Sequence, residues 1–147
     1  AVLARNAGLI GRLIFEITET AAMADLASSA RALARFRDAG ITISMDDYGT
    51  GQSTLAYIQQ LPLGELKLDR QFVRHAHVNR DDGILVRSTI DMAHALGIRV
   101  VAEGVEDQAC LDFLAESGCD HVQGWLIAKA LPADEFLAFI EDARKAA

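Results

Sequence analysis

The sequence predicts an α/β fold in which short parallel strands alternate with helices. Three observations favour this class: β-branched apolar runs recur five times, amphipathic stretches with helical spacing separate them, and glycines close several of those stretches. With 147 residues, the chain has room for one domain with a sizeable core. Two architectures fit this pattern: a complete five-stranded doubly wound sheet, or the last five βα units of a (β/α)8 barrel.

Each predicted strand carries a polar side chain at or near its carboxyl end. The strands are expected at residues 13–18, 41–46, 65–69, 99–103 and 121–124. Ligands bind at the carboxyl edge of a parallel α/β sheet, so these polar side chains should meet in one site. They belong to Glu16, Asp46, Lys67, Glu103 and Gln123.

A helix is expected after each strand. In the first helix, apolar residues at positions 26, 30, 33 and 36 form one stripe that would pack against the sheet. Gly40, Gly97 and Gly118 are suited to end three helices, because glycine readily adopts the left-handed conformation that follows a helix. The last helix is expected to begin at residues 132–135, where a proline and two acids favour the first turn.

The strand at residues 41–46 helps to distinguish the two architectures. Thr42, Ser44 and Asp46 share a small polar face, whereas positions 41, 43 and 45 are apolar. A strand covered by helices on both faces would be apolar on both. The alternation therefore favours a barrel strand with a polar interior face, and the doubly wound sheet is the alternative.

The composition disfavours several classes of function. The chain has 14 basic and 21 acidic residues, a net charge of −7, which argues against DNA, RNA or an anionic membrane as its main partner. No apolar run approaches the roughly 20 residues that a membrane-spanning helix needs. Cys110 and Cys119 are too few for a disulfide-stapled scaffold, although they could form one pair. We therefore expect a cytoplasmic protein.

Two adjacent acids, Asp46 and Asp47, precede the glycine-rich segment at residues 48–51. Neighbouring side chains on a strand point to opposite faces, so both acids can reach one ion pair only where the strand turns into a loop. Carboxylate oxygens suit Mg²⁺ or Mn²⁺ better than zinc. The alternative is a solvated turn that caps the next helix, and acids at the ends of other strands make that alternative less favoured.

Lys67 and Glu103 are the other candidates for chemistry. A lysine facing a barrel interior must be paired with acids or used chemically, for example to orient a water or to neutralise a developing phosphate charge. Glu103 ends an apolar run, where a carboxylate needs a metal, a lysine or a water as partner. The alternatives are an edge-strand lysine in solvent, and a cap for the helix near Asp107.

Several other polar and aromatic residues have structural interpretations as alternatives to functional ones. Gln123 could be a buried amide with internal hydrogen bonds, and Trp125 is more readily a core residue than a platform for a base. His75 and His77 are expected to form a solvated surface pair, His94 to be structural, and His121 to flank the last strand.

Five motifs follow one another in a characteristic order: FEITET at 15–20, DDYGTG at 46–51, LKLDR at 66–70, VAEGVE at 101–106 and QGW at 123–125. Together they resemble the C-terminal part of an EAL domain, and the resemblance covers essentially the whole chain. This family consists of modified (β/α)8 barrels that hydrolyse cyclic di-GMP to linear pGpG with two divalent cations, usually Mg²⁺ or Mn²⁺.

The resemblance implies a role for each matched residue. It implies that Lys67 holds the nucleophilic water and that Glu103 is a metal ligand or general base. The other implied metal ligands are Glu16, Asp46 and Asp47. Further residues would support the site or the substrate, with Glu19 steadying the loop after Asp47; they are Glu19, Asp69, Glu106 and Gln123.

The sequence also departs from the family pattern. The E-x-L glutamate and an asparagine on the next strand, both metal ligands in the family, lie upstream of the matched region, so residues 1–147 are interpreted as a partial EAL domain. Tyr48, Trp125 and Ala130 replace residues that are commoner in the family. The alternative functions are a catalytically inactive cyclic di-GMP receptor and an inactive fragment. Fused GGDEF or sensory domains and a homodimer, with contacts from residues 53–60, are further expectations.

Overall fold

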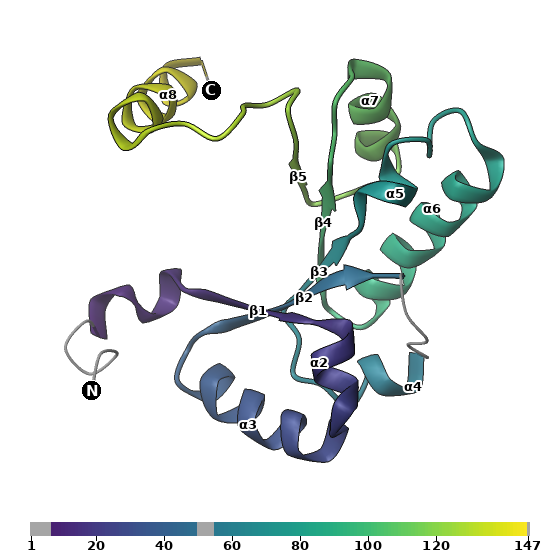
Figure 1. The fold of residues 1–147 in the computed structure, drawn as a ribbon, viewed down its shortest axis with the longest axis vertical. Coiled ribbons are helices and arrows are strands. Elements are labelled where there is room, and N and C mark those ends of the chain that lie inside the picture. Colours follow the sequence, from purple (N-terminus) through teal and green to yellow (C-terminus); the bar gives the residue numbers. More distant parts are fainter. Residues whose placement is uncertain (1–6, 50–54, 147) are drawn as a thin grey trace.

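The computed structural model describes residues 7–49 and 55–146, which contain one five-stranded parallel sheet. The strand order follows the chain from β1 to β5 (Figure 1). A doubly wound sheet would reverse its strand order at a switch point, so that alternative is wrong. Consecutive neighbours are what a barrel requires. The strands are β1 (Ile14–Thr18), β2 (Thr42–Tyr48), β3 (Glu65–Leu68), β4 (Arg99–Glu103) and β5 (His121–Gln123).

Helical segments follow every strand, as the sequence predicts. Figure 1 shows α3, α6 and α7 along one side of the row of strands, whereas η1 and α8 extend away from the helix-covered part. The described helices are η1 (Ala7–Arg12), α2 (Glu19–Ala24), α3 (Leu26–Asp38), α4 (Leu55–Ile58), α5 (Arg70–Val73), α6 (Arg80–Ala95), α7 (Gln108–Glu116) and α8 (Ala133–Ala146).

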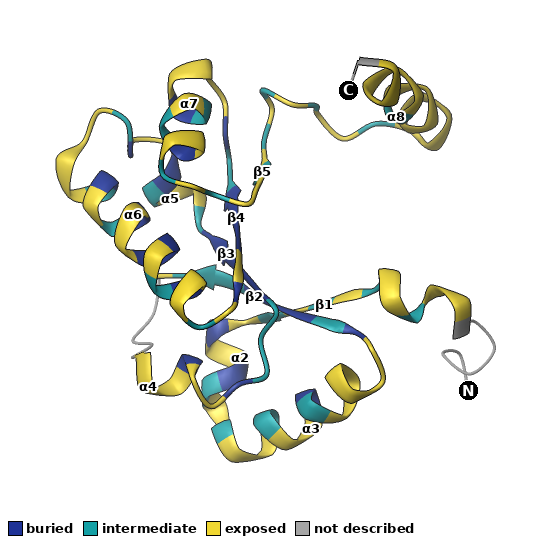
Figure 2. Ribbon diagram, turned by 180° about the vertical axis from the view of Figure 1, so that it is seen from behind, coloured by how far each residue is buried: buried dark blue, intermediate teal, exposed yellow. Residues whose placement is uncertain are grey.

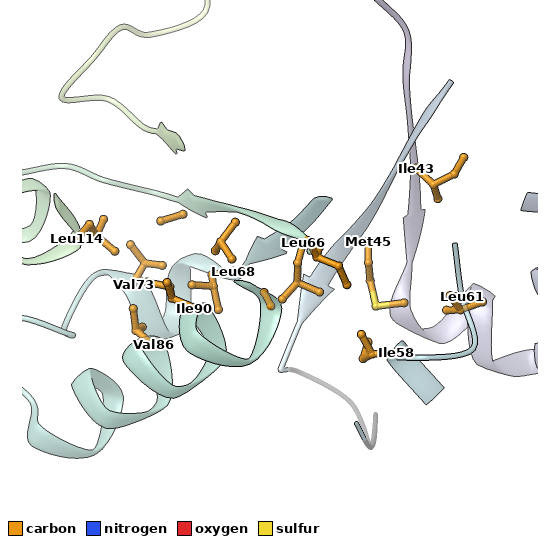
Figure 3. Packing of buried hydrophobic residues seen from close by; sticks show 14 of the residues in the cluster. Ile43, Met45, Ile58, Leu61, Leu66, Leu68, Val73, Val86, Ile90 and Leu114 are labelled. Carbon is orange, nitrogen blue, oxygen red and sulfur yellow. The ribbon is translucent and has the colours of Figure 1, made fainter. Parts of the chain in front are cut away.

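The core lies between the sheet and the helices on its covered face. Ile43 and Met45 of β2 and Leu66 and Leu68 of β3 are fully buried there (Figure 3). They pack in one cluster with apolar side chains of the helices, among them Ile58, Val73, Val86, Ile90 and Leu114. The predicted alternation in β2 is confirmed, because its apolar positions all belong to this cluster.

The uncovered face of the sheet is polar and opens to solvent at its edges. Glu16 on β1 and Gln123 on β5 are exposed, whereas Ser44 and Lys67 near the middle are buried. Burial therefore rises from the edge strands toward the centre of this face. We therefore expect a functional site on the polar face to be centred on β2, β3 and β4.

The helix ends agree with the predicted signals. Gly40, Gly97 and Gly118 follow α3, α6 and α7 with φ angles of +89°, +72° and +77°, a conformation that costs glycine little. The last helix, α8, begins at Ala133 as expected. Its apolar side chains at positions 136, 137 and 139 are exposed, and Figure 2 shows α8 almost entirely in the colour of exposed residues.

The composition argues against a membrane-spanning helix and against a disulfide-stapled scaffold. No helix in the described ranges is long and apolar enough to cross a membrane. Cys110 is buried, Cys119 is half-buried, and both are free thiols.

Candidate functional site

The amino group of Lys67 is the centre of the candidate site. Its Nζ atom lies 2.7 Å from Glu103, 3.0 Å from Asp46 and 3.2 Å from Glu16, in each case measured to a carboxylate oxygen. These three acids come from β4, β2 and β1, so one ammonium group links side chains of four strands. Only 9% of the Lys67 side chain is exposed, because it lies on a central strand. The alternative of an edge-strand lysine in solvent is wrong.

The strand registers explain how these side chains meet. Glu16 pairs with Ser44, two residues before Asp46, and Lys67 pairs with Val101, two residues before Glu103. Residues two apart point to the same face of a sheet. The acids therefore share the polar face with Lys67 at slightly different heights, and the long lysine side chain spans the difference.

The electrostatics of the cluster keep Lys67 charged. Burial alone would lower the pKa of Lys67, but its hydrogen bonds to Glu103, Asp46 and Glu16 outweigh burial and raise the pKa above the usual value. An ammonium with a raised pKa is a hydrogen-bond donor and a fixed positive charge. It is poorly suited to act as a proton acceptor at neutral pH.

The two adjacent acids, Asp46 and Asp47, lie within a β-bulge. Along β2 and β3, Met45 pairs with Leu66 and the next pair is Tyr48 with Leu68, so β2 has one extra residue in between. The strand therefore continues through Asp46 and Asp47, and the expectation that it ends at Asp46 is wrong.

The bulge gives Asp47 an unusual backbone conformation. Its φ angle is +57°, the only positive φ among the described residues other than glycine. Left-handed backbone is tolerated by aspartate more readily than by most residues, but it still has an energetic cost. Burial, together with the nearby charges of Asp46 and Asp69, raises the pKa of the Asp47 carboxyl.

Two further candidate acids support segments next to this bulge. Glu19 is buried at the start of α2. Burial, together with the charge of Glu19, raises the pKa of Tyr48, which directly follows Asp47. Asp69 follows β3 and accepts a hydrogen bond of 2.7 Å from the backbone N–H of Gln71, so it caps α5. The predicted strand at 65–69 is thus one residue too long.

A hollow of about 470 Å³ lies beside Glu103. Glu106 and Gln123 also line it, and Glu106 forms an ion pair of 3.2 Å with Arg74. Gln123 is exposed, so its interpretation as a buried amide is wrong. Trp125, on the same wall, is 67% exposed and is not a core residue.

Two cationic residues of this hollow were not singled out from the sequence: Arg70 and Lys129. Arg70 begins α5 directly after the Asp69 cap. Lys129 lies over the ring of Trp125, with Nζ 5.1 Å from the ring centroid. The only signal in the sequence is the four-residue spacing between Trp125 and Lys129, which is common to many unrelated pairs.

The loops after β4 and β5 are joined through their backbones. Val105 donates its N–H to the carbonyl of Gln123 and accepts from the N–H of Leu126, at 3.1 and 3.0 Å. A side chain at Gly124 would overlap the backbone of Val105, so only glycine allows this approach. The end of β4, which carries Glu103, is thereby fixed against the end of β5.

Asp107 accepts a hydrogen bond of 2.8 Å from the N–H of Cys110 and caps α7, so Glu103 is not the cap. His75 is exposed as expected, and His121, which is also exposed, is the first residue of β5. His77, by contrast, is half-buried 3.9 Å from Asp107, so the solvated surface pair predicted for His75 and His77 is only half right.

The Nε2 atom of His94 lies at a hydrogen-bonding distance of 2.8 Å from a carboxylate oxygen of Asp120, which also accepts from the N–H of Val100. This arrangement fits the structural role expected for His94. The pair lies at the amino-terminal end of β4, away from the acids.

The candidate ligands are of the chemical type that hard divalent cations prefer, because all of them are carboxylates. They are Glu16, Asp46, Asp47 and Glu103. No three His, Cys, Asp or Glu side chains within residues 7–49 and 55–146 are close enough to hold a metal in this arrangement. Thr50 and Gly51 of the glycine-rich segment, and residues 53 and 54 of the expected dimer contact, lie outside the described residues.

The chain is similar to known cyclic di-GMP enzymes. The EAL domain model matches residues 1–130. The chain is 40% identical over 128 residues to the bifunctional diguanylate cyclase/cyclic di-GMP phosphodiesterase MucR of Pseudomonas aeruginosa, covering 87% of this chain and 19% of MucR. The chain thus spans less than a fifth of that relative's length.

Solved structures give the same result. The PaMucR phosphodiesterase in complex with c-di-GMP superposes with a TM-score of 0.85 and 38% identity, over 91% of this chain and 54% of that one. BlrP1 of Klebsiella pneumoniae, in a calcium and cyclic di-GMP complex, has a TM-score of 0.76 and 32% identity over 83% of this chain and 31% of that one. The five parallel strands are therefore part of a barrel like those of EAL domain structures, and the chain belongs to the EAL domain family.

Proposed function

We propose that the complete domain containing this chain hydrolyses cyclic di-GMP to linear pGpG with the help of two divalent cations, Mg²⁺ or Mn²⁺. The observation that carries this proposal is the convergence of Glu16, Asp46 and Glu103 on the amino group of Lys67. Such a concentration of carboxylates around a buried cation is costly unless it serves binding or chemistry. The cyclic di-GMP phosphodiesterases among the relatives support the choice of substrate.

In this proposal, four carboxylates hold the cations: Glu16, Asp46, Asp47 and Glu103. Bound cations would lower the pKa of a coordinated water and neutralise charge on the phosphodiester. The E-x-L glutamate and the asparagine that the resemblance places upstream would complete the ligand set.

Lys67 supplies positive charge and hydrogen bonds at the reacting centre. Because its pKa is raised, its ammonium can donate to a nucleophilic water or to a phosphate oxygen without giving up its proton. In this proposal Glu103 accepts a proton; it ends β4, contacts Lys67 and lines the hollow.

The remaining candidate residues would position the catalytic groups or contact the substrate. Glu19 steadies the segment after Asp47, where its charge acts on Tyr48, and Asp69 interacts with Asp47 while capping α5. Glu106 and Gln123 line the hollow, and in this proposal they contact the substrate. A cytoplasmic location and fused GGDEF or sensory domains belong to the same proposal.

The test is hydrolysis by the complete domain with either Glu103→Gln or Asp46→Asn. We expect each variant to lose at least about 100-fold in turnover, because each removes a group that holds a cation or moves a proton. Formation of pGpG is followed by chromatography in Mn²⁺ and in Mg²⁺. Asp112→Asn is the matched control, because Asp112 is an exposed acid on α7 that accepts a hydrogen bond from Gln108 and does not line the hollow.

Two results would contradict the proposal. Turnover within threefold of the wild type in Glu103→Gln would remove the central role of that carboxylate. Binding of cyclic di-GMP by the wild type without any pGpG in saturating Mn²⁺ would identify the protein as a receptor instead.

A further inference from the structure

The exposed indole of Trp125 is an unusual feature of the hollow beside Glu103. Large aromatic side chains are usually buried, and most of this one is open to solvent. One face of its ring is covered by the ammonium of Lys129 at 5.1 Å. The ring is therefore held at the surface of the hollow rather than in the core.

The hollow also combines opposite charges. Glu103 and Glu106 contribute acids, whereas Arg70 and Lys129 contribute cations. A nucleotide has two parts that match these surfaces: a planar base that stacks on aromatic rings, and an anionic phosphate that pairs with arginine and lysine. A volume of about 470 Å³ is within the range of small-ligand sites.

We infer that Trp125 is the stacking platform for one purine base of the substrate, and that this base displaces Lys129 from the ring. The inference rests on the proposed function and adds to it the group that holds a base. Because Glu103 lines the same hollow, a base on Trp125 would place the adjacent phosphodiester near the Lys67 cluster. Displaced from the ring, the ammonium of Lys129 is free to pair with a phosphate oxygen.

Stacking reads the face of a base rather than its edges. Trp125 should therefore contribute equally to the binding of cyclic di-GMP and of cyclic di-AMP. Any preference between these two dinucleotides would be set by groups other than Trp125.

The experiment measures binding of cyclic di-GMP to the complete domain in Ca²⁺, the cation present with this ligand in the BlrP1 complex. Affinity is obtained by calorimetry, and tryptophan fluorescence is recorded in the same titration. Trp125 is the only tryptophan of this chain, so the difference between wild type and Trp125→Phe isolates its emission.

We expect cyclic di-GMP to quench the emission of Trp125. Trp125→Ala should raise the dissociation constant by about 5- to 150-fold for both dinucleotides, the range that loss of a base-stacking aromatic produces. Trp125→Phe should stay within about threefold of the wild type, because phenylalanine keeps an aromatic face. Thermal unfolding should be unchanged in Trp125→Ala, since the side chain lies largely in solvent.

Phe136→Ala is the matched control, because Phe136 is a 51% exposed aromatic on α8 that does not line the hollow. Its affinity should equal that of the wild type. If Trp125→Ala binds both dinucleotides within twofold of a wild type that binds and hydrolyses cyclic di-GMP, the inference is overturned and the proposed function stands. If the wild type neither binds nor hydrolyses cyclic di-GMP, both fail together.

Discussion

Replacing Lys67 with methionine should destabilise the cation-free domain substantially. The substitution keeps an unbranched side chain of similar length but removes the positive charge that three carboxylates share. Removing one partner of a buried ion pair costs about 3–5 kcal/mol, whereas exposed pairs contribute about 0–1 kcal/mol.

The exposure of the three acids determines how large the loss of unfolding free energy in Lys67→Met should be. Glu16 is 54% exposed and should contribute little, whereas Asp46 and Glu103 are 24% and 22% exposed. We therefore expect a loss of about 3 kcal/mol, below the upper limit for full burial. With a urea m-value of about 2 kcal/mol per molar, the unfolding midpoint should fall by about 1.5 M.

The assay is urea unfolding of the complete domain in EDTA at pH 7, followed by far-ultraviolet circular dichroism. The pKa of Lys67 is raised in the folded state, so its contribution is fully present below the usual value of 10.5 and is lost only as the pH rises through the higher folded value. The full effect is therefore expected at pH 7.

Lys145→Met is the control, because Lys145 pairs with Asp142 at 3.0 Å but both side chains are more than 70% exposed. It should change the midpoint by less than about 0.3 M. Adding Mn²⁺ should recover part of the stability that Lys67→Met loses, since a cation can take the place of the ammonium charge. If Lys67→Met and Lys145→Met shift the midpoint equally, the reasoning about the buried cluster is refuted.

Two further substitutions test the loops and the opposite edge of the sheet. Gly124→Ala should lower stability by about 1–3 kcal/mol and reduce turnover, because its methyl group would overlap the backbone of Val105; an unchanged melting temperature would contradict this. Asp120→Asn should cost about 1.5–3 kcal/mol at pH 7, because the carboxylate loses charge-assisted bonds to the Val100 N–H and His94. Burial alone would raise the pKa of Asp120, but these bonds outweigh burial and lower the pKa in the folded state below the usual value of 3.8. The stability that the Asp120 carboxylate contributes is therefore present above pH 3.8 and is lost as the pH falls through the pKa of the folded state. Urea unfolding at pH 7 and pH 3 should show a smaller difference between wild type and variant at pH 3, and an equal difference would count against the argument.

Much of the fold could be predicted because the relevant signals are local. Apolar and polar residues alternate with period two in β2, and glycine follows three helices. The grouping of Glu16, Lys67 and Glu103 was predicted from their places at the carboxyl ends of strands, since parallel strands bring those ends to one edge.

Other features depend on contacts between distant segments and could not be predicted. The bulge at Asp46 and Asp47 is a property of the register between β2 and β3, which the alternation of one strand does not record. The exposure of Trp125 depends on which segments pack beside β5, and hydrophobicity alone favoured the core. The cation that covers its ring, Lys129, has no distinguishing sequence signal.

The paired backbone bonds between Val105 and the loop after β5 have a consequence for motion. Val105 both donates to Gln123 and accepts from Leu126, so neither loop can open without breaking bonds of the other. The amide hydrogens of Val105 and Leu126 should therefore exchange with solvent in one concerted event rather than independently. A ligand that holds either loop would slow amide exchange in both loops. Amide exchange measured in either loop would therefore give the same fraction of ligand-bound protein.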